Sequence, residues 1–214
     1  MGATQFLSAT VAAAALSTSI AVAETVTYDF TGFDSVKATS GVDVIVEVGD
    51  AFSITLETDG DVERARVEVK GDTLILGRKS QRGMVLNLGR GATYEYTVTM
   101  PELRGGGASA GADLEISGIE GGEVTLDASS GAGIEAEGTC STLRAEASSG
   151  ASVDAFDLEC DDVRADVSSG ADVNVTASDS VRADASSGGA VRVRGNPDDR
   201  RTDKSSGGSV RFVD

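Results

Sequence analysis

The sequence repeats itself with a period of about 19 residues, and self-similarity at a fixed period is the signature of a repeat architecture. The triplet Ser-Ser-Gly begins at Ser129, Ser148, Ser168, Ser186 and Ser205, at nearly equal intervals. A degenerate copy, Ser109-Ala110-Gly111, precedes them, and Thr39-Ser40-Gly41 resembles an earlier one. A unit this short cannot bury an apolar face alone, so repeated units have to stack on one another.

The residues on both sides of each triplet alternate between apolar and polar. Val163-Arg-Ala-Asp-Val167 precedes one triplet and Val173-Asn-Val175 follows it, and the other copies are similar. Strict alternation is the pattern of a β-strand with one buried face. A unit of about 19 residues is too short for a strand-helix-strand crossover. The repeat therefore predicts an all-β fold, a parallel β-helix or β-solenoid, in which each coil contains two strands, a corner and a turn.

The triplets are predicted to form the corners of this solenoid. Their glycines are expected to adopt backbone angles that a Cβ atom would oppose, and the paired serines to satisfy backbone groups and one another. The corner residues are Ser129, Ser130, Gly131, Ser148, Ser149, Gly150, Ser168, Ser169, Gly170, Ser186, Ser187, Gly188, Ser205, Ser206 and Gly207.

Charged residues recur at equivalent positions before the corners. An arginine column is expected from Arg144, Arg164, Arg182 and Arg201, beside an acidic column of Glu146, Asp166, Asp184 and Asp203. Opposite charges in adjacent columns offset the repulsion between like charges stacked on neighbouring strands. In the last repeat, Arg200 and Lys204 replace apolar residues, which is typical of a polar cap at the end of a solenoid.

The two cysteines occupy the same place in successive repeats. Cys140 and Cys160 each stand eight positions before their Ser-Ser-Gly triplet. Stacking would bring their Cα atoms to about 5 Å, which lies within disulfide range. The spacing therefore predicts a Cys140–Cys160 disulfide.

Residues 24–104 are strand-rich but less regular. Strands are expected at Val26–Phe30, Val42–Val48, Phe52–Leu56, Val62–Lys70, Thr73–Leu76, Met84–Leu88 and Tyr94–Met100. Seven of the nine aromatic residues precede Gly107, so the larger core residues are expected at this end. Gly105-Gly106-Gly107 is interpreted as a bend that leads into the regular coils of residues 105–214. We expect residues 24–214 to form one domain.

The composition excludes several classes of function. The chain of 214 residues carries 35 acidic and 18 basic side chains, a formal charge of −17, and no histidine. Catalytic triads that depend on histidine, and histidine-ligated metals, are therefore excluded. Nucleic acids and anionic membranes are unsuitable partners, because both require Lys and Arg to neutralise phosphates.

Residues 1–23 are typical of an export signal. They carry no charged side chain and contain a short apolar, Ala-rich run. Ala21-Val22-Ala23 then precedes Glu24, which predicts a signal peptide at 1–23 with cleavage between Ala23 and Glu24. The run is short for a membrane span, so no transmembrane segment is expected in the mature chain. The predicted location is periplasmic, cell-surface or secreted, where a disulfide can persist.

The order of these motifs resembles a known family, the putative autotransporter adhesin head domain, or head GIN domain. The resemblance rests on the stretch from Phe33 to Val44, on Tyr96 to Leu103, on the serial Ser-Gly corners and on Gly195-Asn-Pro197 before a final Ser206-Gly-Gly208. It implies a right-handed β-helix in exported or envelope proteins of bacteria. It also implies no catalytic residues, since none are assigned in the family.

Candidate chemical groups are carboxylates and one serine. Glu115, Glu135 and Asp154 are expected to form an outward column, and Asp161-Asp162 and Asp198-Asp199 are loop pairs. Paired carboxylates can hydrolyse glycosides, and stacked ones can bind calcium, but acidic residues are scattered along the whole chain. Lys204 next to Ser205 invites a Ser-Lys dyad, although Ser205 belongs to the corner series. The Asn174-Val175-Thr176 sequon and the Asp59-Gly60-Asp61 turn are interpreted as structural.

The sequence therefore favours an exported, non-enzymatic β-solenoid that serves adhesion, binding or envelope structure. No catalytic residue, metal ligand or cofactor is predicted. The partner is expected to be a glycan, a surface protein or another copy of the chain. The alternatives are a carbohydrate-active β-helix enzyme, either a polysaccharide lyase or a hydrolase, and a calcium-stabilised envelope module.

Overall fold

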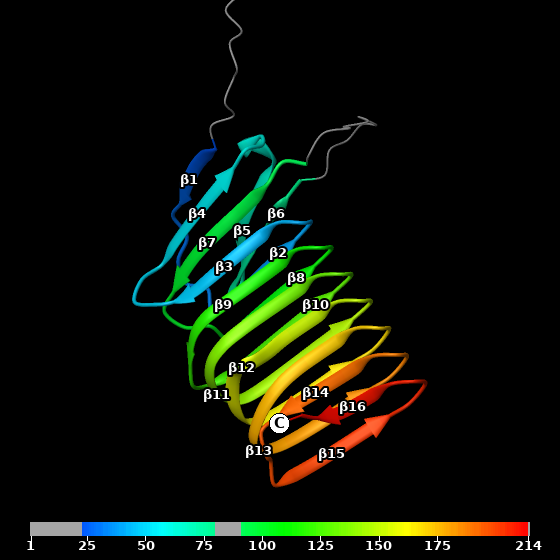
Figure 1. Cartoon of the computed structure of the whole chain (residues 1–214). Helices are drawn as coiled ribbons and strands as arrows, with labels where there is room; N and C mark the ends of the chain where they lie inside the picture. The colour runs from blue at the N-terminus through cyan, green and yellow to red at the C-terminus, as the bar shows by residue number, and fades with distance from the viewer. Residues whose placement is uncertain (1–22, 80–90, 214) are drawn as a thin grey trace, which may run out of the picture.

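The strands of the chain wind into a β-solenoid (Figure 1). The computed structural model describes residues 23–79 and 91–213. The predicted signal peptide, up to residue 22, and the predicted strand Met84–Leu88 lie outside the described residues. The predicted all-β solenoid is confirmed, because the coils stack as parallel strands with their equivalent residues in register.

Sixteen strands and one short 3-10 helix make up the described structure. They are β1 (Glu24–Tyr28), β2 (Ser35–Thr39), β3 (Asp43–Val48), β4 (Ser53–Thr58), η1 (Val62–Arg64), β5 (Ala65–Lys70), β6 (Thr73–Arg78), β7 (Tyr94–Met100), β8 (Gly105–Ser109), β9 (Asp113–Glu120), β10 (Glu123–Ser129), β11 (Gly133–Ser148), β12 (Ser152–Val167), β13 (Asp172–Ala185), β14 (Ala190–Arg194), β15 (Asp199–Lys204) and β16 (Ser209–Phe212).

Each coil contributes one strand to each of two facing layers. The strands that run into a corner, β2, β8, β10, the second halves of β11–β13, and β15, form what we call the pre-corner sheet. The strands that leave a corner, β3, β9, the first halves of β11–β13, β14 and β16, form the post-corner sheet. The corners line up along one edge of the molecule (Figure 1). At the opposite edge, β11, β12 and β13 bend from one sheet into the other.

Each corner is a two-residue turn in which both residues have positive φ. Ser130 has a φ of 56° and Gly131 a φ of 70°, and a similar pair of positive angles recurs at the other Ser-Gly corners. The amide of Ala132 donates to the carbonyl of Ser129 at 3.3 Å and closes the turn, while the amide of Gly131 donates to the carbonyl of Ser149 in the next coil at 3.2 Å. The backbone groups of the corner therefore form hydrogen bonds with other main-chain atoms. The sequence had predicted that the serine hydroxyls would satisfy these groups.

The interpretation of Gly105-Gly106-Gly107 as a bend is wrong. These residues form part of β8, which pairs in parallel with β2 and β10. A Cβ at position 106 would lie 2.7 Å from the side chain of Ile116 on the facing sheet and 3.0 Å from Leu126 on the neighbouring strand, so the absence of a side chain at Gly106 makes room for these larger core residues. The predicted strand Val62–Lys70 is wrong in its first part. Val62–Arg64 forms the 3-10 helix η1, with Asp61 as its N-cap, and the strand β5 begins only at Ala65.

The strands β1 and β4–β7 extend both sheets at the N-terminal end. β7 lies beside β3 in the post-corner sheet, followed by β4 and β1 in antiparallel order. β6 lies beside β2 in the pre-corner sheet, followed by β5. Because β2 and β3 already form a coil with a corner at Ser40-Gly41, the coils begin before residue 105.

The core is a continuous file of small apolar side chains, as the alternating pattern predicts. Val, Leu, Ile and Ala fill the regular coils, and the buried aromatics Phe33, Tyr94 and Tyr96 lie at the N-terminal end. At the other end, all six residues of β15 are exposed, including Arg200 and Lys204 at positions that are apolar in the preceding coil. The guanidinium of Arg200 lies 4.6 Å from the ring centre of Phe212, which is itself partly exposed.

Candidate binding surfaces

The outer face of the pre-corner sheet carries a ladder of paired charges. Arg144, Arg164, Arg182 and Arg201 lie in register, and so do Glu146, Asp166, Asp184 and Asp203 beside them. The two predicted columns are therefore present. Each of the first three arginines bonds the carboxylate two positions further along its own strand, as Arg164 does with Asp166 at 2.8 Å.

The ladder also joins neighbouring coils. The guanidinium of Arg164 lies 3.7 Å from the carboxylate of Asp184 on the next strand. The hydrogen bond to Asp166 and the nearby charges raise the pKa of Arg164 above that of a free arginine. Since these side chains are a quarter to a half exposed, the pairs contribute little to stability. Their main effect is on the distribution of charge over this face.

A groove runs between this ladder and the corners. Its volume is about 520 Å³. Its lining includes the acidic column Asp127, Glu146, Asp166, Asp184 and Asp203 and the residues Ser148, Ser168, Ser186 and Ser205. Each coil from Glu146 onward supplies one carboxylate and one serine two positions later, so the groove presents the same pair of groups again and again. We call it the ladder groove.

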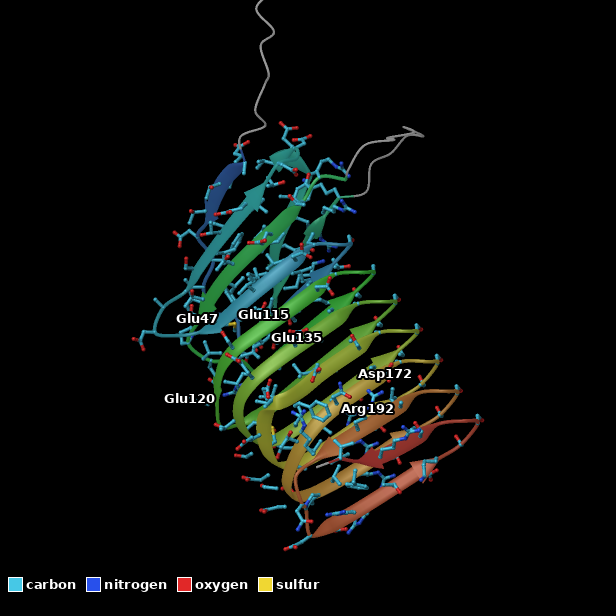
Figure 2. The ribbon with its side chains drawn as sticks, in the orientation of Figure 1. Glu47, Glu115, Glu120, Glu135, Asp172 and Arg192 are labelled. Atoms are coloured by element: carbon cyan, nitrogen blue, oxygen red, sulfur yellow. A yellow bond between two sulfur atoms is a disulfide. The ribbon has the colours of Figure 1, made fainter. Side chains whose placement is uncertain are left out.

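The outer face of the post-corner sheet is acidic and its charges are not balanced in the same way. Glu115, Glu135 and Asp154 lie in register on adjacent strands, as expected from the sequence (Figure 2 labels the first two). Asp43, Asp113 and Glu95 line the same hollow, which has a volume of about 490 Å³. Within residues 23–79 and 91–213, no salt bridge joins Glu115, Glu135 or Asp154 to a basic side chain.

The acidic face ends in a small mixed cluster near the C-terminus. Asp154 and Phe156 line a second hollow of about 280 Å³, together with Arg194. The guanidinium of Arg194 lies 3.9 Å above the ring centre of Phe156. Beyond them, Arg192 lies 3.8 Å from Asp172 (Figure 2).

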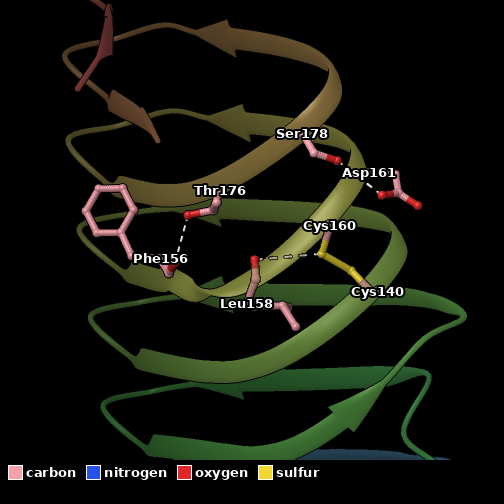
Figure 3. Close-up of a disulfide and its surroundings, with 7 residues drawn as sticks. All are labelled: Cys140, Phe156, Leu158, Cys160, Asp161, Thr176 and Ser178. Carbon is pink, nitrogen blue, oxygen red and sulfur yellow. Dashed lines mark hydrogen bonds between the residues drawn. A yellow bond between two sulfur atoms is a disulfide. The ribbon is translucent and has the colours of Figure 1, made fainter. Parts of the chain in front are cut away.

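The predicted disulfide is confirmed at the curved edge of the solenoid (Figure 3). Cys140 and Cys160 are buried partners in the parallel ladder between β11 and β12, with a Cα–Cα distance of 4.5 Å. The sulfur of Cys160 lies 3.9 Å from the carbonyl oxygen of Leu158. This is a packing contact, because a disulfide sulfur carries no hydrogen to donate.

The other carboxylates singled out in the sequence have local structural partners. Asp161 accepts a hydrogen bond from Ser178 at 3.1 Å, and Asp162 accepts one from Ser180 (Figure 3 shows the first). Asp59 accepts from the amide and hydroxyl of Thr93, which lowers the pKa of its carboxyl. Asp198-Asp199 lies at the start of β15, where Asp199 pairs with Arg201 at 2.8 Å.

The remaining candidates are structural in their surroundings. The side-chain oxygen of Asn174 accepts from Arg192 at 3.2 Å, and Thr176 donates to the carbonyl of Phe156 at 2.7 Å. Ser205 lines the ladder groove and Lys204 ends β15. In the described ranges, no group of three or more His, Cys, Asp or Glu is arranged to hold a metal ion. The same ranges contain no helix long and apolar enough to cross a membrane.

Sequence reasoning missed two features of these surfaces. One is the ladder groove, whose lining comes from five strands and the neighbouring corner residues, so that no single segment of the sequence predicts it. The other is the contact between Phe156 and Arg194. Two signals in the sequence point to this contact. Phe156 is one of only two aromatic residues after Gly107, and the interval from Ser148 to Ser168 is the widest between the Ser-Ser-Gly triplets and contains irregular strand register.

Comparison with solved structures supports the fold. A putative adhesin from Bacteroides fragilis NCTC 9343 aligns with a TM-score of 0.67 at 17% identity, covering 90% of this chain and 97% of that one. A putative adhesin from Parabacteroides merdae ATCC 43184 aligns at 0.53 and 13% identity, covering 90% and 96%. A putative lipid binding protein from Parabacteroides distasonis ATCC 8503 aligns at 0.52 and 16%, covering 90% and 97%. At these identities the likeness concerns the fold alone.

The family is shown by the sequence itself. No match was found among curated proteins. A family model described as "Putative auto-transporter adhesin, head GIN domain" matches residues 32–197, which span the coils from β2 to the turn before β15. Because this match covers most of the chain, the resemblance noted in the sequence is confirmed, and the protein belongs to the auto-transporter adhesin head GIN domain family.

Proposed function

We propose that the chain is an exported, non-enzymatic module that binds a surface polymer or surface protein through the charged outer faces of its solenoid. The observation that carries this proposal is the ladder of paired charges on the pre-corner sheet, where Arg144, Arg164 and Arg182 each bond an acidic neighbour. Such a face offers donors and acceptors at a regular interval without a strong net charge. The adhesin description of the family and of two similar structures agrees with a binding role.

A carbohydrate-active enzyme is the second candidate. The observation in its favour is the acidic column Glu115–Glu135–Asp154 beside Phe156, since a pair of carboxylates can cleave a glycosidic bond. A lipid-binding role comes from the name of one similar structure. An acidic surface does not attract anionic head groups, so any lipid bound here would be neutral or cationic.

The test is a binding survey with the chain from Glu24 to Asp214. The protein would be applied to arrays of neutral and charged glycans, to immobilised surface proteins, to vesicles of neutral lipid and to bacterial cells. Each glycan that binds would then be incubated with the protein and examined for shortened chains. Binding without cleavage is the expected result. Cleavage by the parent that is lost in Glu135→Gln would contradict the binding module and support the carbohydrate-active enzyme. Absence of binding to every probe, bacterial cells included, would reject the binding module.

Export is tested separately. When the full chain is produced in a bacterium, the proposal expects the protein in the periplasm or medium, with Glu24 as its first residue. The mass of the recovered protein measures the cleavage point. Recovery of the uncut chain from the cytoplasm alone would contradict export and leave the binding survey unaffected.

A further inference from the structure

We infer that the ladder groove binds a neutral, linear polysaccharide chain, laid along the solenoid axis with its sugars facing successive coils. The inference rests on the proposed function as a binding module and assigns the ligand class and the place on the surface. The groove has the volume of an open binding site, about 520 Å³, and extends from β10 to β15 across the regular coils.

The charges of the groove select against ions and charged polymers. Three of its five carboxylates, Glu146, Asp166 and Asp184, are paired with arginines of the adjacent column. A cation would therefore have to compete with a guanidinium that is already in place. An anionic polymer would be repelled by Asp127 and Asp203, which line the groove and form no salt bridge within the described residues. A neutral ligand meets neither obstacle.

The hydrogen-bonding groups suit hydroxyls. A carboxylate accepts hydrogen bonds through two oxygens, and a serine hydroxyl both donates and accepts. Glu146 with Ser148, Asp166 with Ser168, and Asp184 with Ser186 place one acceptor and one hydroxyl on each of three successive coils. Sugars carry hydroxyls that can donate to the first and exchange hydrogen bonds with the second.

The periodicity favours a polymer with a short repeat over a folded protein. Adjacent strands in a sheet lie about 4.8 Å apart, so the five carboxylates extend over about 19 Å. A ligand that uses all five positions has to present equivalent groups at a regular interval, which a glycan chain of identical sugars does. Protein interfaces instead rely on a few buried aromatic or apolar anchors, and the apolar residues that line this groove, Ala128, Ala147, Val167 and Ala185, belong to the buried core.

The test is calorimetric titration of residues 24–214 with defined oligosaccharides. The neutral probes are linear gluco-, xylo- and manno-oligosaccharides of increasing length, and the charged probes are galacturonic acid and glucosamine oligomers. We expect binding of at least one neutral series, with an affinity that rises with length and levels off once the chain spans the groove. Preference for either charged series, or an affinity independent of length, would overturn the inference.

Matched variants locate the site. The triple variant Ser148→Ala, Ser168→Ala, Ser186→Ala removes three hydroxyls without changing charge, and should weaken binding about tenfold or more. Ser168→Arg places a long side chain in the middle of the groove, at a corner position that leaves the core untouched, and should also weaken it. The control on the other sheet, Glu115→Gln, Glu135→Gln, Asp154→Asn, should bind as the parent does. Circular dichroism confirms that each variant is folded.

The outcomes separate this inference from the function on which it rests. If the control variant loses binding while the serine variant retains it, the binding module stands and the ladder groove is the wrong site. If no neutral oligosaccharide binds but the protein still adheres to cells or surface proteins, the ligand class is wrong. If the protein binds nothing in either survey, both proposals fail.

Discussion

The hydroxyl of Tyr96 on β7 donates a hydrogen bond of 2.8 Å to the carbonyl oxygen of Gly77 on β6. The two strands belong to different sheets, since β7 extends the post-corner sheet and β6 the pre-corner sheet. Tyr96 is fully buried, so the bond crosses the interior of the N-terminal end. The bond connects the two sheets at the N-terminal end, where β6 and β7 are not joined by a Ser-Ser-Gly corner as the strands of the regular coils are.

Removal of this bond should destabilise the fold. Tyr96→Phe keeps the ring and deletes only the hydroxyl, and a buried hydrogen bond is worth about 1 kcal/mol. We expect the free energy of unfolding to fall by about 1–2 kcal/mol, measured by urea denaturation at neutral pH. Thr97→Val on the exposed side of the same strand is the control and should change little. Equal losses in the two variants would contradict a specific role for the bond.

The same tyrosine should make stability sensitive to alkaline pH. Burial raises the pKa of Tyr96 above that of a free tyrosine, and burial also raises the pKa of Tyr28. Above about pH 10 the unfolded chain loses the phenol proton while the folded chain keeps it, so the folded state binds more protons. Stability should be constant in this respect below about pH 10 and fall as pH rises toward the raised folded pKa. Urea midpoints measured on both sides of about pH 10 give the slope, and Tyr96→Phe should make it shallower. An unchanged slope would assign the effect to other groups.

Reduction of the Cys140–Cys160 disulfide should lower stability without unfolding the chain at room temperature. The bridge closes a segment with a sequence separation of 20, for which chain entropy predicts about 3 kcal/mol. The double variant Cys140→Ala, Cys160→Ala should therefore melt several degrees lower than the oxidised protein. Calorimetry with and without a thiol reductant provides the comparison. The reductant should have no effect on the double variant, and an effect there would point to another cause.

Two glycines should differ in their tolerance of alanine. Gly131 at a corner has positive φ, but a Cβ there meets open space, so Gly131→Ala should cost only the conformational strain, about 1 kcal/mol. At Gly138 the φ is 131° and a Cβ would overlap the carbonyl oxygen of Ile119. Gly138→Ala forces the backbone of two coils apart and should cost at least twice as much. The measurement is the urea midpoint of each variant, and a similar cost at both sites would show that the coils can adjust.

Repulsion between the carboxylates of the acidic face should lower the stability of the fold, and salt should reduce this effect. Glu115, Glu135 and Asp154 stack on adjacent strands, where like charges directly opposite one another are destabilising. The variant Glu115→Gln, Glu135→Gln, Asp154→Asn should melt at a higher temperature than the parent in dilute buffer. The difference should shrink at high ionic strength, because salt screens exposed charges. Arg144→Gln with Glu146→Gln removes a balanced pair and serves as the control. A lower melting temperature for the acidic variant would mean that these carboxylates have stabilising partners.

The regular part of this protein follows from its amino-acid sequence. A repeat with alternating apolar residues can bury its faces only if equivalent residues stack, so the coil, the charge columns and the Cys140–Cys160 pairing all follow from one period. The resemblance to the head GIN domain family rests on the same order of motifs, and the match to residues 32–197 confirms it.

Features that do not recur with the repeat could be identified only in the folded molecule. Gly105–Gly107 lies in a strand because β2 and β10 on either side supply its backbone partners, a fact that no local property of three glycines reveals. The N-terminal extension depends on pairing between residues far apart in the chain, as in β1 with β4 and β4 with β7. The ladder groove likewise is lined by residues of several stacked coils. Stacking translates a sequence period directly into contacts, whereas long-range pairing and surface relief exist only once the whole chain has folded.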